Sequence, residues 1–178
     1  MMKIEYEARV LEVDEKKLIE SLEKLGAKKI GKYNYRRYTY DVKPKADKKW
    51  IRLRTDGKTT TLTIKEIKDY TIDGTIEKEI IVSDFDITNE ILNDLGYIPK
   101  SYQENKRVRY KLNDVEIDID TWPLIPTYVE VEGNSEKEVL ETLKKLEIGK
   151  EQIVTTDVEG IFLKVYGIDI SKMKELKF

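Results

Sequence analysis

Segment after segment of this sequence alternates apolar residues with charged or polar ones. In residues 3–10, every second residue from Ile4 to Val10 is apolar, and the residues between them are charged. This period of two is typical of β-strands, because successive side chains of a strand point to opposite faces. The pattern, with β-favouring composition, predicts eight strands over residues 3–10, 33–42, 50–55, 59–66, 76–82, 105–112, 115–121 and 127–132.

Helical periodicity separates some of these strands. The expected helices cover residues 15–25, 86–95, 136–147 and 157–166. Asp14 and Ser135 are placed to cap two of them, and Gly26 and Gly96 follow the ends of two. We find no low-complexity linker and no internal repeat. The prediction is therefore a single domain over residues 1–178, of the α+β class and mainly antiparallel β.

The charges are segregated along the chain. Residues 28–65 hold thirteen Lys or Arg against three Asp, a net of +10, and residues 112–136 hold seven Asp or Glu and no Lys or Arg, a net of −7. Surfaces usually intersperse the two signs. The segregation suggests one region that binds an anion and one that binds cations. The alternative is two oppositely charged strands that neutralise each other across a sheet.

The chain contains no Cys and no His. This excludes a disulfide framework, a thiolate or imidazole metal site, and catalysis by a Cys nucleophile or a His base. No stretch has the roughly 18 apolar residues of a membrane span. The N-terminal residues lack an apolar signal core, so we expect a cytoplasmic protein.

The charged strand faces have two possible environments. In an antiparallel sheet with one packed face, they would face water. If the eight strands close into a barrel, the charged faces would line a polar lumen, and the apolar faces would turn outward beneath the helices. Carboxylates without His or Cys favour Mg²⁺, Mn²⁺ or Ca²⁺, and converging Arg and Lys favour phosphate. Both together suggest a polyphosphate with its metal, although the sequence has no glycine-rich phosphate loop.

Short motifs carry a family resemblance over about residues 3–133. Glu5-Tyr6-Glu7-Ala8-Arg9 is similar to the ExExK signature of the CYTH superfamily, the triphosphate tunnel metalloenzymes. The motifs that follow in the family's order are Arg52-Leu53-Arg54, Lys65, Arg107 three residues before a tyrosine, Asp120, and Glu130-Val131-Glu132. The superfamily includes inorganic and thiamine triphosphatases and class IV adenylyl cyclases.

The resemblance implies an eight-stranded antiparallel β-barrel that forms a tunnel, with helices packed on its outside. It implies Mg²⁺ or Mn²⁺ bound by Glu5, Glu7, Asp120, Glu130 and Glu132, of which the four glutamates are the candidate catalytic residues. The residues expected to bind the triphosphate are Arg9, Arg52, Arg54, Lys65 and Arg107. Arg109 shares a strand face with Arg107, and Arg37 lies in the basic early strand, so both are added as candidates.

The expected function is metal-dependent hydrolysis of tripolyphosphate, or of a nucleoside or thiamine triphosphate. The first alternative is a class IV adenylyl cyclase that makes cyclic AMP and diphosphate from ATP, and the second is a non-catalytic polyphosphate-binding module. The expected partner is a small-molecule triphosphate, with neither nucleic acid nor membrane, and a homodimer is one option for the assembly.

The sequence departs from the family pattern at two places. Arg9 replaces the usual lysine and keeps the charge, but its pKa above 12 makes it a poor proton donor or acceptor. Residues 122–126, Trp-Pro-Leu-Ile-Pro, replace a glycine-rich turn. The favoured interpretation of this segment is a turn with a buried Trp122.

Overall fold

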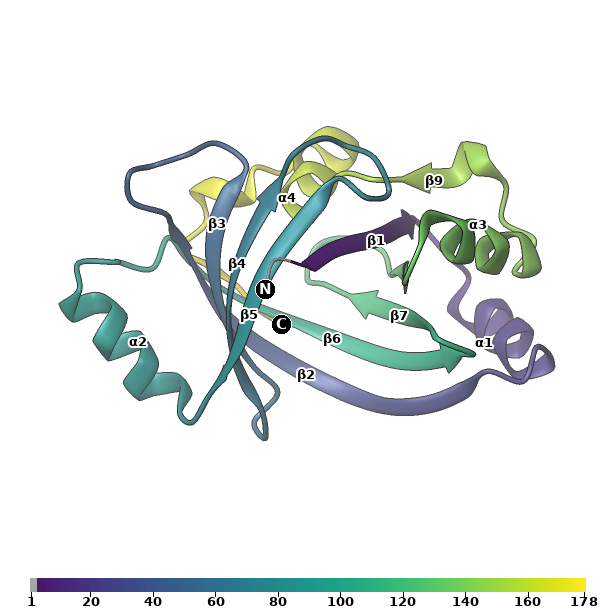
Figure 1. Cartoon of the computed structure of the whole chain (residues 1–178), viewed down its shortest axis with the longest axis horizontal. Helices are drawn as coiled ribbons and strands as arrows, with labels where there is room; N and C mark the ends of the chain where they lie inside the picture. Colours follow the sequence, from purple (N-terminus) through teal and green to yellow (C-terminus); the bar gives the residue numbers. More distant parts are fainter. Residues whose placement is uncertain (1–2) are drawn as a thin grey trace.

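The alternating segments form eight long strands that close into a barrel (Figure 1). The computed structural model describes residues 3–178. The barrel strands are β1 (Lys3–Val10), β2 (Lys28–Asp41), β3 (Lys49–Thr55), β4 (Thr60–Ile67), β5 (Thr75–Val82), β6 (Ser101–Leu112), β7 (Val115–Thr121) and β8 (Tyr128–Gly133). Each pairs antiparallel with its neighbours in the order β6-β2-β3-β4-β5-β1-β8-β7, and β7 returns to β6. The predicted eight-stranded antiparallel barrel is confirmed.

Two strands are longer than their local pattern predicts. β2 begins at Lys28 rather than residue 33, and β6 begins at Ser101 rather than residue 105. The two pair along almost their whole lengths, with an irregularity between Lys29 and Gly31. These ends are held by pairing with a strand about 70 residues away, which a local alternation does not reveal. Two short strands were also missed, β9 (Ile153–Val154) beside β1 and β10 (Glu175–Leu176) beside β6.

Three helices lie outside the barrel wall, as predicted. They are α1 (Glu15–Lys24), α2 (Phe85–Asp94) and α3 (Glu136–Lys145). Asp14, Asp84 and Ser135 cap them, each accepting a backbone N–H three residues later. Figure 1 shows α1 and α3 together at one end of the molecule and α2 at the other.

The apolar core lies between the barrel wall and these helices rather than inside the barrel. On the outer face, Ile117, Val129 and Val131 are buried against the helical residues Leu22 and Leu143. A second outer cluster joins α2 to β2 and β3. Because side chains alternate along each strand, the residues between these apolar positions point into the barrel. The lumen therefore receives the charged face of every barrel strand that carries one.

The C-terminal segment differs from the helix predicted over residues 157–166. One α-turn, α4 (Val158–Gly160), runs directly into a π-helical turn at Ile161–Val165. Helical periodicity predicted the helical character but does not separate these two kinds of turn. Ile161 and Phe162 are fully buried with Trp122 in a third apolar cluster. This cluster holds the C-terminal segment against the barrel.

Within residues 3–178, we find no helix with the length and apolar character needed to cross a membrane.

Candidate functional site

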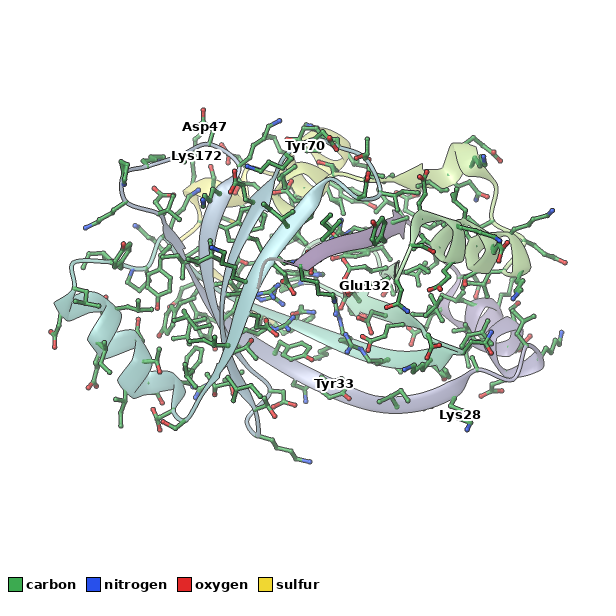
Figure 2. The ribbon with its side chains drawn as sticks, viewed as in Figure 1. Lys28, Tyr33, Asp47, Tyr70, Glu132 and Lys172 are labelled. Atoms are coloured by element: carbon green, nitrogen blue, oxygen red, sulfur yellow. The ribbon has the colours of Figure 1, made fainter. Side chains whose placement is uncertain are left out.

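The barrel encloses a cavity of about 660 Å³. All twelve residues that the sequence suggested for metal or triphosphate binding line this cavity. They come from seven strands, β1 to β4 and β6 to β8, and Figure 2 shows side chains gathered inside the barrel near the labelled Glu132. The residues are Glu5, Glu7, Arg9, Arg37, Arg52, Arg54, Lys65, Arg107, Arg109, Asp120, Glu130 and Glu132.

The candidate metal-binding glutamates lie side by side on β1 and β8. Glu7 is the register partner of Glu132, and Arg9 is the partner of Glu130. Arg9 is 5% exposed and its Nη2 lies 3.1 Å from Glu7 and 2.6 Å from Glu130. Its Nη1 also donates to the carbonyl of Thr156 at 3.0 Å, so the C-terminal segment fixes this guanidinium.

Two lysines pair with the remaining glutamates. Lys65 Nζ lies 2.7 Å from Glu5, and Lys3 Nζ lies 2.8 Å from Glu132. Burial raises the pKa values of the Glu5 and Glu132 carboxyls above their ordinary range. Burial acts in the same direction on Glu130, but Arg9 and Arg107 outweigh it and lower the pKa of that carboxyl far below its usual value.

These carboxylates have the donor chemistry of a magnesium or manganese site. Within residues 3–178, however, no three acidic side chains converge closely enough to hold a metal ion as the side chains stand. The basic partners occupy the space between the glutamates. We therefore expect metal binding to require Lys65 and Arg9 to exchange their carboxylate partners for other anions.

Arg107 is the most fully engaged basic residue of the lumen. Its Nε and Nη2 donate to the two oxygens of Asp120 at 2.8 and 2.5 Å. It also contacts Asp118 at 2.5 Å and Glu130 at 3.2 Å. Asp120, a predicted metal ligand, thus presents both of its oxygens to Arg107, and the geometry favours a role in orienting that guanidinium.

Asp118 is a structural residue of the site that was not among the residues predicted from the sequence. It is 2% exposed, contacts Arg107, and accepts hydrogen bonds from Arg109 Nε and Nη2 at 2.7 Å each. Its position beside Asp120 on an alternating strand was a signal that could have found it. One buried carboxylate thus holds two guanidiniums in fixed orientations.

Replacing Asp118 with asparagine should therefore destabilise the barrel by about 3 kcal/mol, because the Arg107 guanidinium and the half-buried Arg109 guanidinium lose the buried carboxylate that they share. In a protein of this size, each kcal/mol corresponds to about 2–4 °C in the melting temperature. Thermal unfolding followed by circular dichroism measures the change. The matched control is Asp114→Asn in the exposed turn after β6, and equal melting temperatures for the two variants would contradict the prediction.

A second group of cations has few or no carboxylate partners. Within the described chain, no carboxylate oxygen lies within 4 Å of a guanidinium nitrogen of Arg37 or Arg54, and Arg52 has only Glu79 at 3.5 Å. Arg37 stacks over Trp122 at 4.7 Å and Arg54 over Tyr35 at 4.5 Å. We call Arg37, Arg52 and Arg54 the arginine cluster.

Arg37 is buried, Arg52 and Arg54 are half-buried, and the three positive charges repel one another. Burial, with Arg52 and Arg54 nearby, lowers the pKa of Arg37 well below its ordinary value. Burial and the neighbouring Arg52 and Arg107 lower the pKa of Arg54 to about 10, so it still carries its charge at neutral pH. A concentration of positive charge in a cavity is a strong site for a polyanion.

The segment 122–126 proved to be more than a turn. Trp122 is buried, as expected, and its indole N–H donates to the Tyr128 hydroxyl at 3.0 Å. Its ring also supports Arg37 at the cavity wall. The segment 122–126 thus helps to position Arg37, a member of the arginine cluster, through the ring of Trp122.

Comparison with known proteins places this site in context. The profile of the CYTH domain matches residues 1–157. No curated protein matches the chain. Among solved structures, the PH1012 protein of Pyrococcus horikoshii aligns with a TM-score of 0.76 at 21% identity, covering 86% of this chain and 96% of that one.

Two further structures have names that mention an activity. A candidate adenylate cyclase of Vibrio parahaemolyticus aligns with a TM-score of 0.76 at 10% identity, covering 90% of this chain and 98% of that one. A candidate adenylyl cyclase of Hippeastrum, described as having a dominant triphosphatase activity, aligns with a TM-score of 0.62 at 15% identity, covering 94% and 97%. At these identities the three structures support the fold alone.

Proposed function

Since this chain belongs to the CYTH domain family, we propose that it is a metal-dependent triphosphatase that hydrolyses tripolyphosphate or a related triphosphate inside its barrel. The observation that carries the proposal is the arginine cluster, which has Glu79 as its one carboxylate contact within the described chain and adjoins the glutamates of β1 and β8. A triphosphate supplies the missing negative charge. The glutamates supply oxygen ligands for the metal that accompanies it.

We assign different roles in binding and catalysis to different residues of the lumen. The arginine cluster binds and orients the phosphates, because guanidinium groups match phosphate oxygens in geometry and charge. Lys65 and Arg9 add positive charge once their carboxylate partners are taken by the metal. When bound, Mg²⁺ or Mn²⁺ would neutralise phosphate oxygens and polarise the attacking water. A carboxylate of the glutamate set would accept the proton from that water.

Arg9 would not exchange protons during the reaction. Burial disfavours its charge, but Glu130 and Glu7 outweigh burial and raise the pKa of Arg9 well above its ordinary value. Its contact with the Thr156 carbonyl holds it in place. We therefore assign Arg9 to electrostatic stabilisation and to positioning of the two glutamates.

The direct test is an assay of products. Tripolyphosphate, ATP and thiamine triphosphate are each incubated with the protein in Mg²⁺ and in Mn²⁺, and orthophosphate, diphosphate and cyclic AMP are measured. Orthophosphate from any of them without cyclic AMP from ATP supports the triphosphatase. Cyclic AMP with equal diphosphate would show that the chain is a cyclase instead. Binding without turnover would leave a polyphosphate-binding module.

Tripolyphosphate should stabilise the protein even without metal, because the three charges of the arginine cluster have only one carboxylate, Glu79, in contact with them within the described chain. A ligand at one hundred times its dissociation constant adds about 2.7 kcal/mol to the stability of the fold. For this chain length, the melting temperature should rise by about 5–10 °C. The measurement is a thermal melt in EDTA, with sodium chloride at equal ionic strength as the control. Equal melting temperatures in the two solutions would contradict an anion site.

A further inference from the structure

Asn105 lies between the two charge groups of the lumen. It is on β6, 1% exposed, and behind the residues that line the cavity. Its side-chain oxygen accepts a hydrogen bond from Arg37, and its Nδ2 donates to Asp120 at 3.0 Å. Only this orientation of the amide satisfies both partners, because a guanidinium can only donate and a carboxylate can only accept.

The two partners of Asn105 belong to networks of opposite character. Asp120 belongs to the network in which Arg107 is held by three carboxylates. Arg37 belongs to the arginine cluster, which has almost no carboxylate contacts. Within residues 3–178, Asn105 is the one side chain that hydrogen-bonds to both Arg37 and Asp120. The amide therefore links the two networks without adding charge to either.

The protein does not use every hydrogen-bond donor of Arg37. Asn105 takes one of its nitrogens, and Trp122 covers one face of the guanidinium. Its Nε is buried and has no hydrogen-bond partner within the described chain, and the same is true of Arg52 Nε. Buried donors without partners are costly, and phosphate oxygens are suited to satisfy them.

We infer that Asn105 is a positioning residue of the triphosphate site: it holds Arg37 toward a bound phosphate and keeps the negative charge of the Asp120 network away from the arginine cluster. This inference rests on the proposed function. An aspartate at this position would have nearly the same shape but would neutralise Arg37. The neutrality of Asn105, and not only its hydrogen bonds, preserves the positive charge that the polyanion binds.

The test compares tripolyphosphate binding by Asn105→Asp and the wild-type protein, using titration calorimetry in EDTA. We expect the dissociation constant to rise about tenfold or more, which corresponds to about 1.4 kcal/mol. The matched control is Asn34→Asp on the exposed outer face of β2, which makes the same change in net charge and should bind like the wild type. Equal affinity of Asn105→Asp and the wild type would overturn the inference.

Asn105→Ala separates the charge effect from loss of the hydrogen bonds. It should weaken binding less than Asn105→Asp does, and equal or greater weakening would show that neutrality is not the property that matters. A spectroscopic readout comes from Trp122, observed alone in a Trp50→Phe background. Release of Arg37 from Asn105 should change the Trp122 emission in Asn105→Ala, and an unchanged spectrum would contradict the positioning role.

Failure of the proposed function gives a different result. If the wild-type protein neither binds nor hydrolyses tripolyphosphate, the proposed function falls and the inference falls with it. If the wild type binds tripolyphosphate and Asn105→Asp binds it equally well, only the inference on Asn105 falls.

Discussion

Replacement of Glu5 with glutamine is expected to reduce triphosphate turnover by about a hundredfold or more while leaving triphosphate binding intact. Glu5 is 5% exposed, lines the cavity and is paired with Lys65 at 2.7 Å. The amide keeps the volume of the side chain but removes the negative charge that a divalent cation requires. Loss of one preorganised electrostatic interaction in an active site commonly costs this much in rate.

The binding measurement makes this prediction specific. Without metal, Glu5→Gln should bind tripolyphosphate as tightly as the wild type or more tightly, because Lys65 loses its closest carboxylate partner and becomes free for phosphate. Phosphate release in Mn²⁺ gives the turnover, and calorimetry in EDTA gives the affinity. Glu20→Gln on the exposed face of α1 is the control. Wild-type turnover in Glu5→Gln would exclude a catalytic role for this carboxylate.

Glu130→Gln should also lose turnover, but its result is harder to interpret because the substitution also affects stability. Glu130 is shared by Arg9 and Arg107, and its removal leaves both guanidiniums with less counter-charge in a buried site. The resulting loss of stability would lower activity by a second route. Replacement of Glu5 is the better test of chemistry, because its partner Lys65 keeps a second carboxylate, Glu77, at 3.7 Å.

The strands and their charged faces were predictable because β-strand alternation is a local property, whereas their closure into a barrel was implied by the family resemblance. The charged residues of residues 3–10 and 115–121 occur at every second position, so the chain itself assigns them to one face. Once the strands close, that face becomes the lumen, and the twelve candidate residues meet in one cavity. Capping residues such as Asp14 and Ser135 marked the starts of two helices for the same reason, since a cap acts within one turn.

The partners within the lumen were not predictable, because they depend on register between strands distant in sequence. The motifs placed Arg54 and Arg107 in one class of phosphate-binding residues. The structure separates them, with Arg107 bound by three carboxylates and Arg54 by none within the described residues. Asn105 gave no signal, because an amide in a polar strand has many possible roles. Its position between Arg37 and Asp120 appears only when β2, β6 and β7 are brought together.

This division within the lumen leads to a second large effect, the replacement of Arg54 with methionine. Burial and the neighbouring arginines lower the pKa of Arg54 to about 10. The folded protein therefore holds this proton less tightly than the unfolded chain does, so at neutral pH the charge on Arg54 opposes folding. Arg54→Met should raise the melting temperature by a few degrees, and should weaken metal-free tripolyphosphate binding by about tenfold or more.

Arg107→Met removes the same charge from the same lumen and should have the opposite effect on stability. It leaves Asp118, Asp120 and Glu130 without their shared partner, and breaking such a buried group costs about 3–5 kcal/mol.

Thermal melts of the Arg54→Met and Arg107→Met variants, with calorimetry for binding, distinguish an arginine that binds the ligand from one that stabilises the fold. If Arg54→Met melts as low as Arg107→Met, then Arg54 serves the fold through its packing on Tyr35, and the arginine cluster is not a reserved anion site. A rise in stability with a loss of binding would mean instead that the barrel tolerates repulsion between buried cations because a polyanion relieves it.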